Sequence, residues 1–111
     1  MIRAKFSVQG KTLKMSVRGH ANAAKKGEDL ICAGASMLAF TAAQDVRDMA
    51  DAGRLEEKPV INLQDGRTIL ELTPKEDAFA EALHTLFIVQ KGFVVLAANN
   101  PKYVRVKPMT A

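Results

Sequence analysis

Residues 2–18 alternate apolar and polar side chains on both sides of a glycine turn, and this pattern restricts the fold more than any other feature. A period of two places one set of side chains on each face of a strand. The turn Gln9-Gly10-Lys11 separates the two runs, as in a hairpin. We therefore expect an N-terminal hairpin with an apolar inner face and a basic outer face. The expected inner side chains are Ile2, Ala4, Phe6, Val8, Leu13, Met15 and Val17, and the basic ones are Arg3, Lys5, Lys14 and Arg18.

Two longer segments have apolar side chains at helical spacing. The first is expected to begin at Asp29, a favourable N-cap, and to end at Gly53, a favourable C-cap residue. The second is expected to begin at residues 73–76, TPKE, which combine a capping threonine, a proline for the first helical position and a capping-box glutamate. It ends before Pro101, and Gly92 is a weak point inside it where it can break.

Three further strands complete the prediction. Residues 59–63 and 67–72 flank Gln64-Asp65-Gly66, a strong hairpin signal, and residues 103–107 alternate again. The order β-β-α-β-β-α-β predicts an α/β (α+β) fold, with a mostly antiparallel sheet and two helices packed on one face. With 111 residues, we expect a single domain over residues 1–111.

The cellular setting is suggested by the cysteine content. A chain with one cysteine cannot form an intramolecular disulfide, which favours a reducing cytoplasm. We see no apolar run near the roughly 20 residues that cross a bilayer and no signal peptide at the N-terminus. The formal net charge of +4 permits a phosphate-rich partner without requiring one.

The single cysteine, Cys32, is the first candidate for chemistry. It falls at the third position of the helix expected after Asp29, where the helix dipole favours a thiolate and free amides can stabilise an oxyanion. His20 lies on the preceding segment between two glycines and can fold back to serve as general base and acid. The alternative is a buried thiol and an unrelated loop histidine, and spacing alone does not decide.

Two stretches carry a resemblance to a known family. Gly19-His20-Ala21, followed by GEDLICAGAS at residues 27–36, resembles the ribosomal-processing cysteine proteases of bacteria. The resemblance implies a cytoplasmic, homodimeric endopeptidase. Such enzymes remove a short N-terminal extension, which ends in an aromatic-rich motif, from a large-subunit ribosomal protein and so support ribosome assembly.

By the same resemblance, His20 and Cys32 match the catalytic pair. The supporting or substrate-binding positions are Gly19, Ala21, Gly27, Asp29 and Ser36. The chain departs from the family at Asn22, where many relatives have glycine, and this departure concerns the loop more than the pair.

Several roles stay open from the residues alone. Ser36 lies one helical turn after Cys32 and either bonds the substrate backbone or back-bonds within the helix. Asp29 either orients His20 or only caps the helix. Gly19 and Gly27 are either hinges of a lid or ordinary turn residues.

A different class of function competes with catalysis. A basic sheet face, extended by Lys102, Arg105 and Lys107, would suit a small RNA- or ribosome-binding module. RNA-reading sheets use aromatic side chains, and only Tyr103 is available on the expected strand faces. Direct nucleic-acid binding is therefore left open. We expect a peptide substrate, no membrane partner, no cofactor and no metal, and we expect His84 to be a solvated helix residue.

Overall fold

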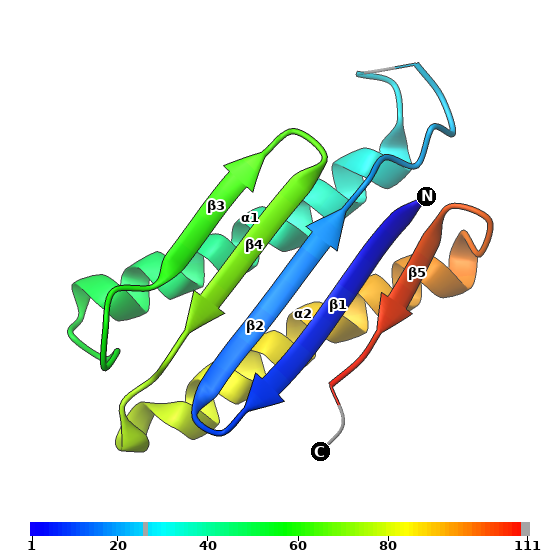
Figure 1. Cartoon of the computed structure of the whole chain (residues 1–111). Coiled ribbons are helices and arrows are strands. Elements are labelled where there is room, and N and C mark those ends of the chain that lie inside the picture. The colour runs from blue at the N-terminus through cyan, green and yellow to red at the C-terminus, as the bar shows by residue number, and fades with distance from the viewer. Residues whose placement is uncertain (26, 110–111) are drawn as a thin grey trace.

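The computed structural model describes residues 1–25 and 27–109 and contains a five-stranded sheet in the order β3-β4-β2-β1-β5 (Figure 1). Strand β5 is parallel to β1, and the other neighbours are antiparallel, which confirms the mostly antiparallel α+β fold. In chain order the elements are β1 (Ile2–Gln9), β2 (Thr12–Arg18), α1 (Leu30–Asp51), β3 (Val60–Gln64), β4 (Arg67–Leu72), the 3-10 turn η1 (Glu76–Ala78), α2 (Phe79–Asn99) and β5 (Val104–Lys107).

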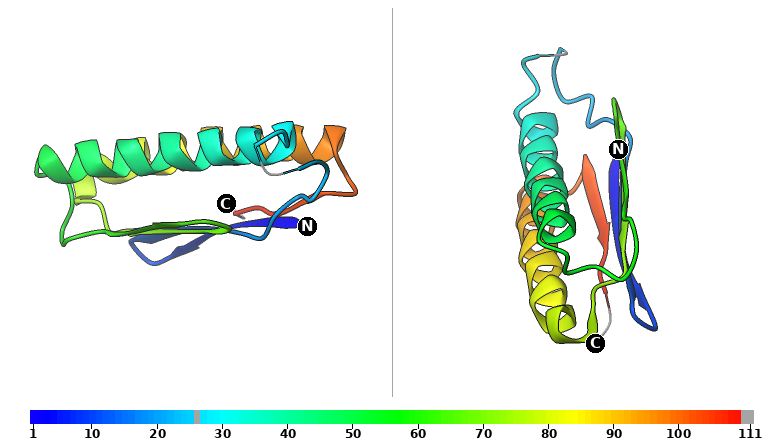
Figure 2. Two further views of the ribbon diagram at one scale, coloured as in Figure 1. Left: turned by 90° about the horizontal axis from the view of Figure 1, so that it is seen from above. Right: turned by 90° about the vertical axis from the view of Figure 1, so that its left-hand side faces the viewer.

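The molecule has two layers. Both helices lie side by side on one face of the sheet, and the other face is uncovered (Figure 2). The expected alternation is confirmed in most of the hairpin, where the inward side chains are buried and the charged outward ones are exposed; Ser7, Val8 and Ser16 are half-buried. Phe6 and Phe93 are buried at the centre of the core, with their ring centroids 5.9 Å apart.

Helix α1 begins and ends as expected. Asp29 is its N-cap, and the residue after the C-cap, Gly53, adopts a left-handed backbone conformation with φ of +70°. The buried side of α1 is made largely of small residues, which lets the helix lie close to the sheet and to α2. These buried residues are Ala35, Ala39, Ala42, Ala43, Val46 and Met49.

The expected start of the second helix was wrong. Residues 73–75 do not form its first turn; η1 begins at Glu76 and α2 only at Phe79. The Thr73 hydroxyl pairs with Thr12 Oγ1 at 2.9 Å and donates to Glu57, so it is not available as a cap. The local capping signal therefore does not decide where the helix starts, because Thr73 bonds to the first hairpin instead.

Gly92 does not break α2, which runs without interruption to Asn99. A Cβ built on Gly92 would collide with Leu38 Cδ2 of α1. The glycine is therefore explained by the close approach of the two helices, which sequence periodicity cannot show.

Residues Glu76–Asn99 are long and apolar enough to cross a membrane, judged by length and composition alone. The expectation that no run approaches this length was therefore wrong. In the structure, Leu86, Val89 and Phe93 of this helix are buried in the core. Its other side exposes Ile88 and Val95, whereas His84 is exposed as expected.

Replacing Phe93 by alanine tests the core. Phe93 is fully buried against Phe6, so Phe93→Ala should lower the free energy of unfolding by about 3–5 kcal/mol. Lys58→Ala, in the exposed loop before β3, is the control and should change it by less than about 0.5 kcal/mol. Urea denaturation measures both, and equal losses would contradict this description of the core.

Candidate active site

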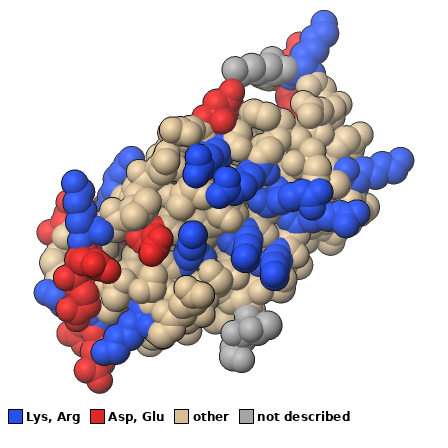
Figure 3. Space-filling view, viewed as in Figure 1, with Lys and Arg blue, Asp and Glu red and all other residues tan. Residues whose placement is uncertain are grey.

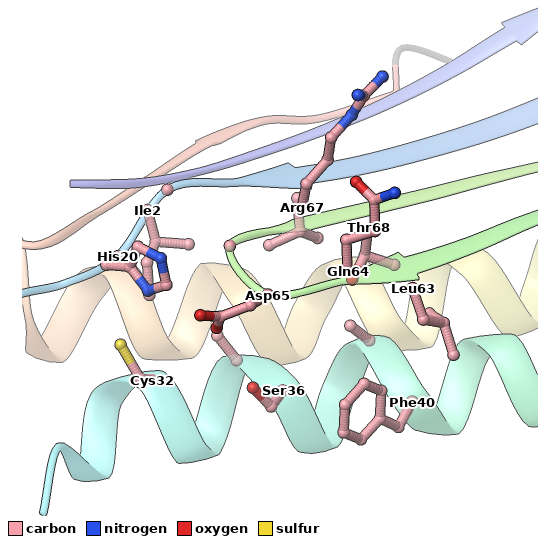
Figure 4. A pocket seen from close by; sticks show the side chains of 15 residues that line it. Ile2, His20, Cys32, Ser36, Phe40, Leu63, Gln64, Asp65, Arg67 and Thr68 are labelled. Carbon is pink, nitrogen blue, oxygen red and sulfur yellow. The ribbon is translucent and has the colours of Figure 1, made fainter. Parts of the chain in front are cut away.

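A cavity of about 270 Å³ lies at the end of the sheet where β2 leads into the loop before α1. Three parts of the chain surround it: this loop, the first turns of α1 and the β3–β4 turn (Figure 4). It brings His20, Cys32 and Ser36 together. Other lining residues include Phe40, Asp65, Gly66 and Arg67.

Cys32 is the third residue of α1, as expected from the cap at Asp29. Its sulfur accepts a hydrogen bond from the backbone N–H of Ala21, with an N–S distance of 3.4 Å. This bond fixes Ala21, the residue immediately after His20, against the thiol. Ala21 itself is buried, so the loop is anchored at the point where it passes the sulfur.

Asp29 holds the helix and the loop at once. One carboxylate oxygen accepts from the backbone N–H groups of Ile31 and Cys32, and the other accepts from Ala23, each at 3.0 Å. The N–H of Cys32 contributes most to lowering the pKa of Asp29, while partial desolvation opposes it. Through its bond to the backbone N–H of Ala23, this carboxylate positions the loop that carries His20.

The idea of several free first-turn amides needs correction. The N–H groups of Ile31 and Cys32 are bonded to the Asp29 side chain, and that of Ala33 is bonded to the Asp29 carbonyl at 3.0 Å. The sequence showed a favourable cap and a favourable anion site at the same place. The cap therefore occupies the N–H groups of Ile31 and Cys32, which are not free to bind an anion.

His20 is exposed and lies against the β3–β4 turn. A Cβ on Gly66 would lie 2.5 Å from His20 Nε2, so only a glycine there leaves room for the ring in this position. The Gly19 N–H donates to the Gly66 carbonyl at 2.9 Å, and the N-terminal amine donates to the His20 carbonyl at 2.5 Å. Figure 4 shows the Cys32 sulfur pointing from α1 toward the side where the His20 ring lies.

The backbone of the loop explains its glycines and the departure at residue 22. Gly19 and Gly27 have φ of +96° and +89°, and Asn22 has φ of +56°. Asparagine tolerates the left-handed region better than other residues with a side chain, so it can replace glycine at position 22 with little strain. A Cβ on Gly19 would also collide with the carbonyl of Met1, whereas Gly27 has open space around it.

Ser36 and Asp65 complete this side of the cavity. Within the described residues Ser36 forms no hydrogen bond, whereas Thr41 of the same helix back-bonds to Met37 at 2.7 Å. The Ser36 hydroxyl is thus exposed and directed at the cavity (Figure 4). Sequence reasoning missed Asp65, which points into the same space from the β3–β4 turn. Its own segment predicts only a hairpin turn, and nothing in that segment signals chemistry.

No group of three His, Cys, Asp or Glu side chains with the geometry of a metal site occurs in residues 1–25 and 27–109. The cavity instead combines a thiol, an imidazole and a hydroxyl. These are the groups with which cysteine hydrolases work.

The comparisons identify the family. The sequence matches the family described as cysteine protease Prp over residues 1–105. The chain therefore belongs to the Prp family of cysteine proteases, which are hydrolases. Among curated proteins, no sequence matches it.

Solved structures share the fold. One is an essential ribosomal processing protease Prp from S. aureus with a covalently linked product peptide; it is 22% identical, covers 99% of this chain and 100% of its own, and has a TM-score of 0.71. The same protease with a substrate peptide is 21% identical, with 99% of this chain and 100% of that chain covered and a TM-score of 0.65. SMU.848 from Streptococcus mutans is 23% identical, with 100% and 96% of the two chains covered and a TM-score of 0.69.

Replacing Gly66 by alanine tests how the turn positions His20. The new Cβ should displace the ring, and the His20 resonances in an NMR spectrum should shift. Gly10→Ala is a matched control, because Gly10 also has a positive φ in a hairpin turn but has nothing within 4 Å of its Cβ position. Both changes strain the backbone by a similar amount. His20 resonances that do not move in Gly66→Ala would contradict this contact.

The Asp29 carboxylate predicts a pH dependence. Its pKa is lowered in the folded state from the ordinary 3.8, so its stabilising effect is full above that value and is lost as the pH falls through the lowered pKa. Asp29→Asn caps without titrating. The melting temperature of wild type should therefore fall more steeply than that of Asp29→Asn between about pH 5 and pH 2. Parallel curves would show that the carboxylate does not contribute in this way.

Proposed function

We propose that residues 1–111 form a single protease domain that acts as a cytoplasmic cysteine endopeptidase. Its substrate is the short N-terminal extension of a large-subunit ribosomal protein, and its removal supports ribosome assembly. The observation that carries the proposal is the bond from Ala21 N–H to Cys32 Sγ, which holds the histidine loop on the thiol beside a cavity. Membership of the Prp family and the peptide-bound S. aureus structures support it.

The chemistry needs only the residues of the cavity. His20 accepts the thiol proton of Cys32, and the sulfur attacks the scissile carbonyl carbon. When the tetrahedral intermediate collapses, the C–N bond breaks and His20 returns the proton to the leaving amine. Water, deprotonated by His20, then attacks the thioester carbonyl. The C–S bond breaks, the second product leaves as the acid, and His20 returns the proton to the sulfur of Cys32. Gly19, Ala21, Gly27 and Asp29 support the loop in this scheme.

Two features of the cavity suit the substrate. Ser36 presents its hydroxyl to a peptide backbone, and Phe40, which is 52% exposed one turn further along α1, offers a surface to an aromatic side chain. An aromatic-rich cleavage motif would thus lie along α1, with its scissile bond at Cys32.

We also propose a homodimer. The outer side of the helices exposes several large apolar side chains, which are unusual on the free surface of a monomer when they gather on one face. They are Met37 on α1 and Ile88, Val94 and Val95 on α2. A second copy would cover them, and analytical ultracentrifugation of the wild type tests it.

Alanine variants of the pair test the proposal. Cleavage of a peptide spanning the extension of the host's ribosomal protein should be abolished in Cys32→Ala and reduced about 10²–10⁴-fold in His20→Ala, the usual loss of a general base and acid. His84→Ala is the matched control, because His84 is the other histidine and is exposed on α2.

Alkylation gives a second measurement that needs no substrate. Iodoacetamide should modify Cys32 faster than a free thiol near neutral pH, and His20→Ala should slow it, while His84→Ala should not. Cleavage that survives in Cys32→Ala would contradict the role of Cys32 as nucleophile. A wild type that cuts no peptide would instead favour a binding module without catalysis.

A further inference from the structure

The uncovered face of the sheet carries a row of four arginines in one register. Arg67 of β4 pairs with Arg18 of β2, Arg18 with Arg3 of β1, and Arg3 with Arg105 of β5. All four are exposed, and Figure 3 shows the blue side chains gathered across these strands. With neighbouring strands about 4.8 Å apart, the arginine row extends over roughly 14 Å.

This arrangement has no explanation in the stability of the sheet. Like charges directly opposite each other on neighbouring strands are destabilising. Within residues 1–25 and 27–109, none of the four guanidinium groups forms an ion pair with a carboxylate. The next outward-facing position of β1 also pairs two like charges, since Lys5 lies opposite Lys107 of β5. The carboxylate on this face, Glu71, lies further away, opposite Lys14.

The chemistry of the row selects its partner. Four guanidinium groups at regular spacing fit a chain of phosphates, because each can donate two parallel hydrogen bonds to phosphate oxygens. The sole aromatic side chain in the five strands is Phe6, and it is buried, so bases cannot stack on this face. The exposed apolar side chains that a membrane surface would need are mainly on the helices, Val60 being the exception in a strand.

We infer that the arginine row docks the protein on the phosphate backbone of structured RNA. The choice of RNA among phosphate polymers rests on the proposed function, because a ribosomal protein substrate lies next to RNA; the row itself does not depend on it. The row also lies at the site end of the sheet. Arg18 directly precedes Gly19-His20, and Arg67 directly follows Gly66, so docking there would bring the cavity close to protein bound on the same RNA.

The test compares two triple variants with the same net charge. R3Q/R18Q/R105Q removes most of the row, and K58Q/K75Q/K91Q removes exposed lysines outside it; each lowers the formal net charge from +4 by three, to +1. Fluorescence anisotropy measures binding to an RNA duplex of about 20 base pairs between about 50 and 200 mM salt. The row variant should bind at least about tenfold more weakly than the lysine variant, with a log K against log salt slope less steep by about 2 to 3.

Several outcomes would overturn the inference. Equal losses in the two variants would show a general charge effect, and tighter binding to a DNA duplex or to phosphatidylserine vesicles would point to another partner. Thermal unfolding and peptide cleavage by the row variant check that it is folded. Wild type that cuts peptide but binds no RNA overturns this inference alone. Wild type that binds RNA through the row but cuts no peptide overturns only the proposed function.

Discussion

The geometry of the candidate site depends on one carboxylate. Asp29 accepts hydrogen bonds from the first turn of α1 on one oxygen and from Ala23 of the preceding loop on the other. This shared acceptor joins the loop to the first turn of the helix, in addition to the chain itself at residue 29. With it, the backbone N–H of Ala21 reaches the sulfur of Cys32, and His20 and Cys32 line the same cavity. The same carboxylate thus caps the helix and anchors the loop.

The second constraint comes from the sheet. Strands β2 and β4 are in register up to Arg18 and Arg67, so Gly19 meets Gly66 immediately beyond the last pair. The missing Cβ of Gly66 provides the space in which the His20 ring lies. A shift of register by one residue would turn every side chain of β4 to the opposite face and move this turn away. The placement of the imidazole therefore depends on strand pairing far from the thiol in sequence.

Much of this could be predicted from local patterns, and the rest depended on contacts between distant segments. Alternation in residues 2–18 and the cap at Asp29 are local signals, and both were confirmed. The capping signal at Thr73 is equally local, yet Thr73 does not cap the helix because its hydroxyl bonds to Thr12 of the first hairpin. Gly92 was expected to weaken its helix, and a place for Asp65 in the cavity was not expected. In both cases the role depends on a distant segment. Their roles come from Leu38 and from the cavity, which no nearby residue reveals.

The two faces of the sheet carry different demands. On the covered face, packing needs apolar side chains at every second position, and this fixes which residues of β1 and β2 point outward. The outward positions do not have to be apolar. Repulsion between the paired arginines there lowers stability, and core packing does not require it. Such a cost is retained when a partner supplies the opposite charge. The arginine row and the cavity lie at the same end of the sheet. Arg18 ends β2 immediately before the His20 loop, and Arg67 begins β4 immediately after the turn that contacts His20.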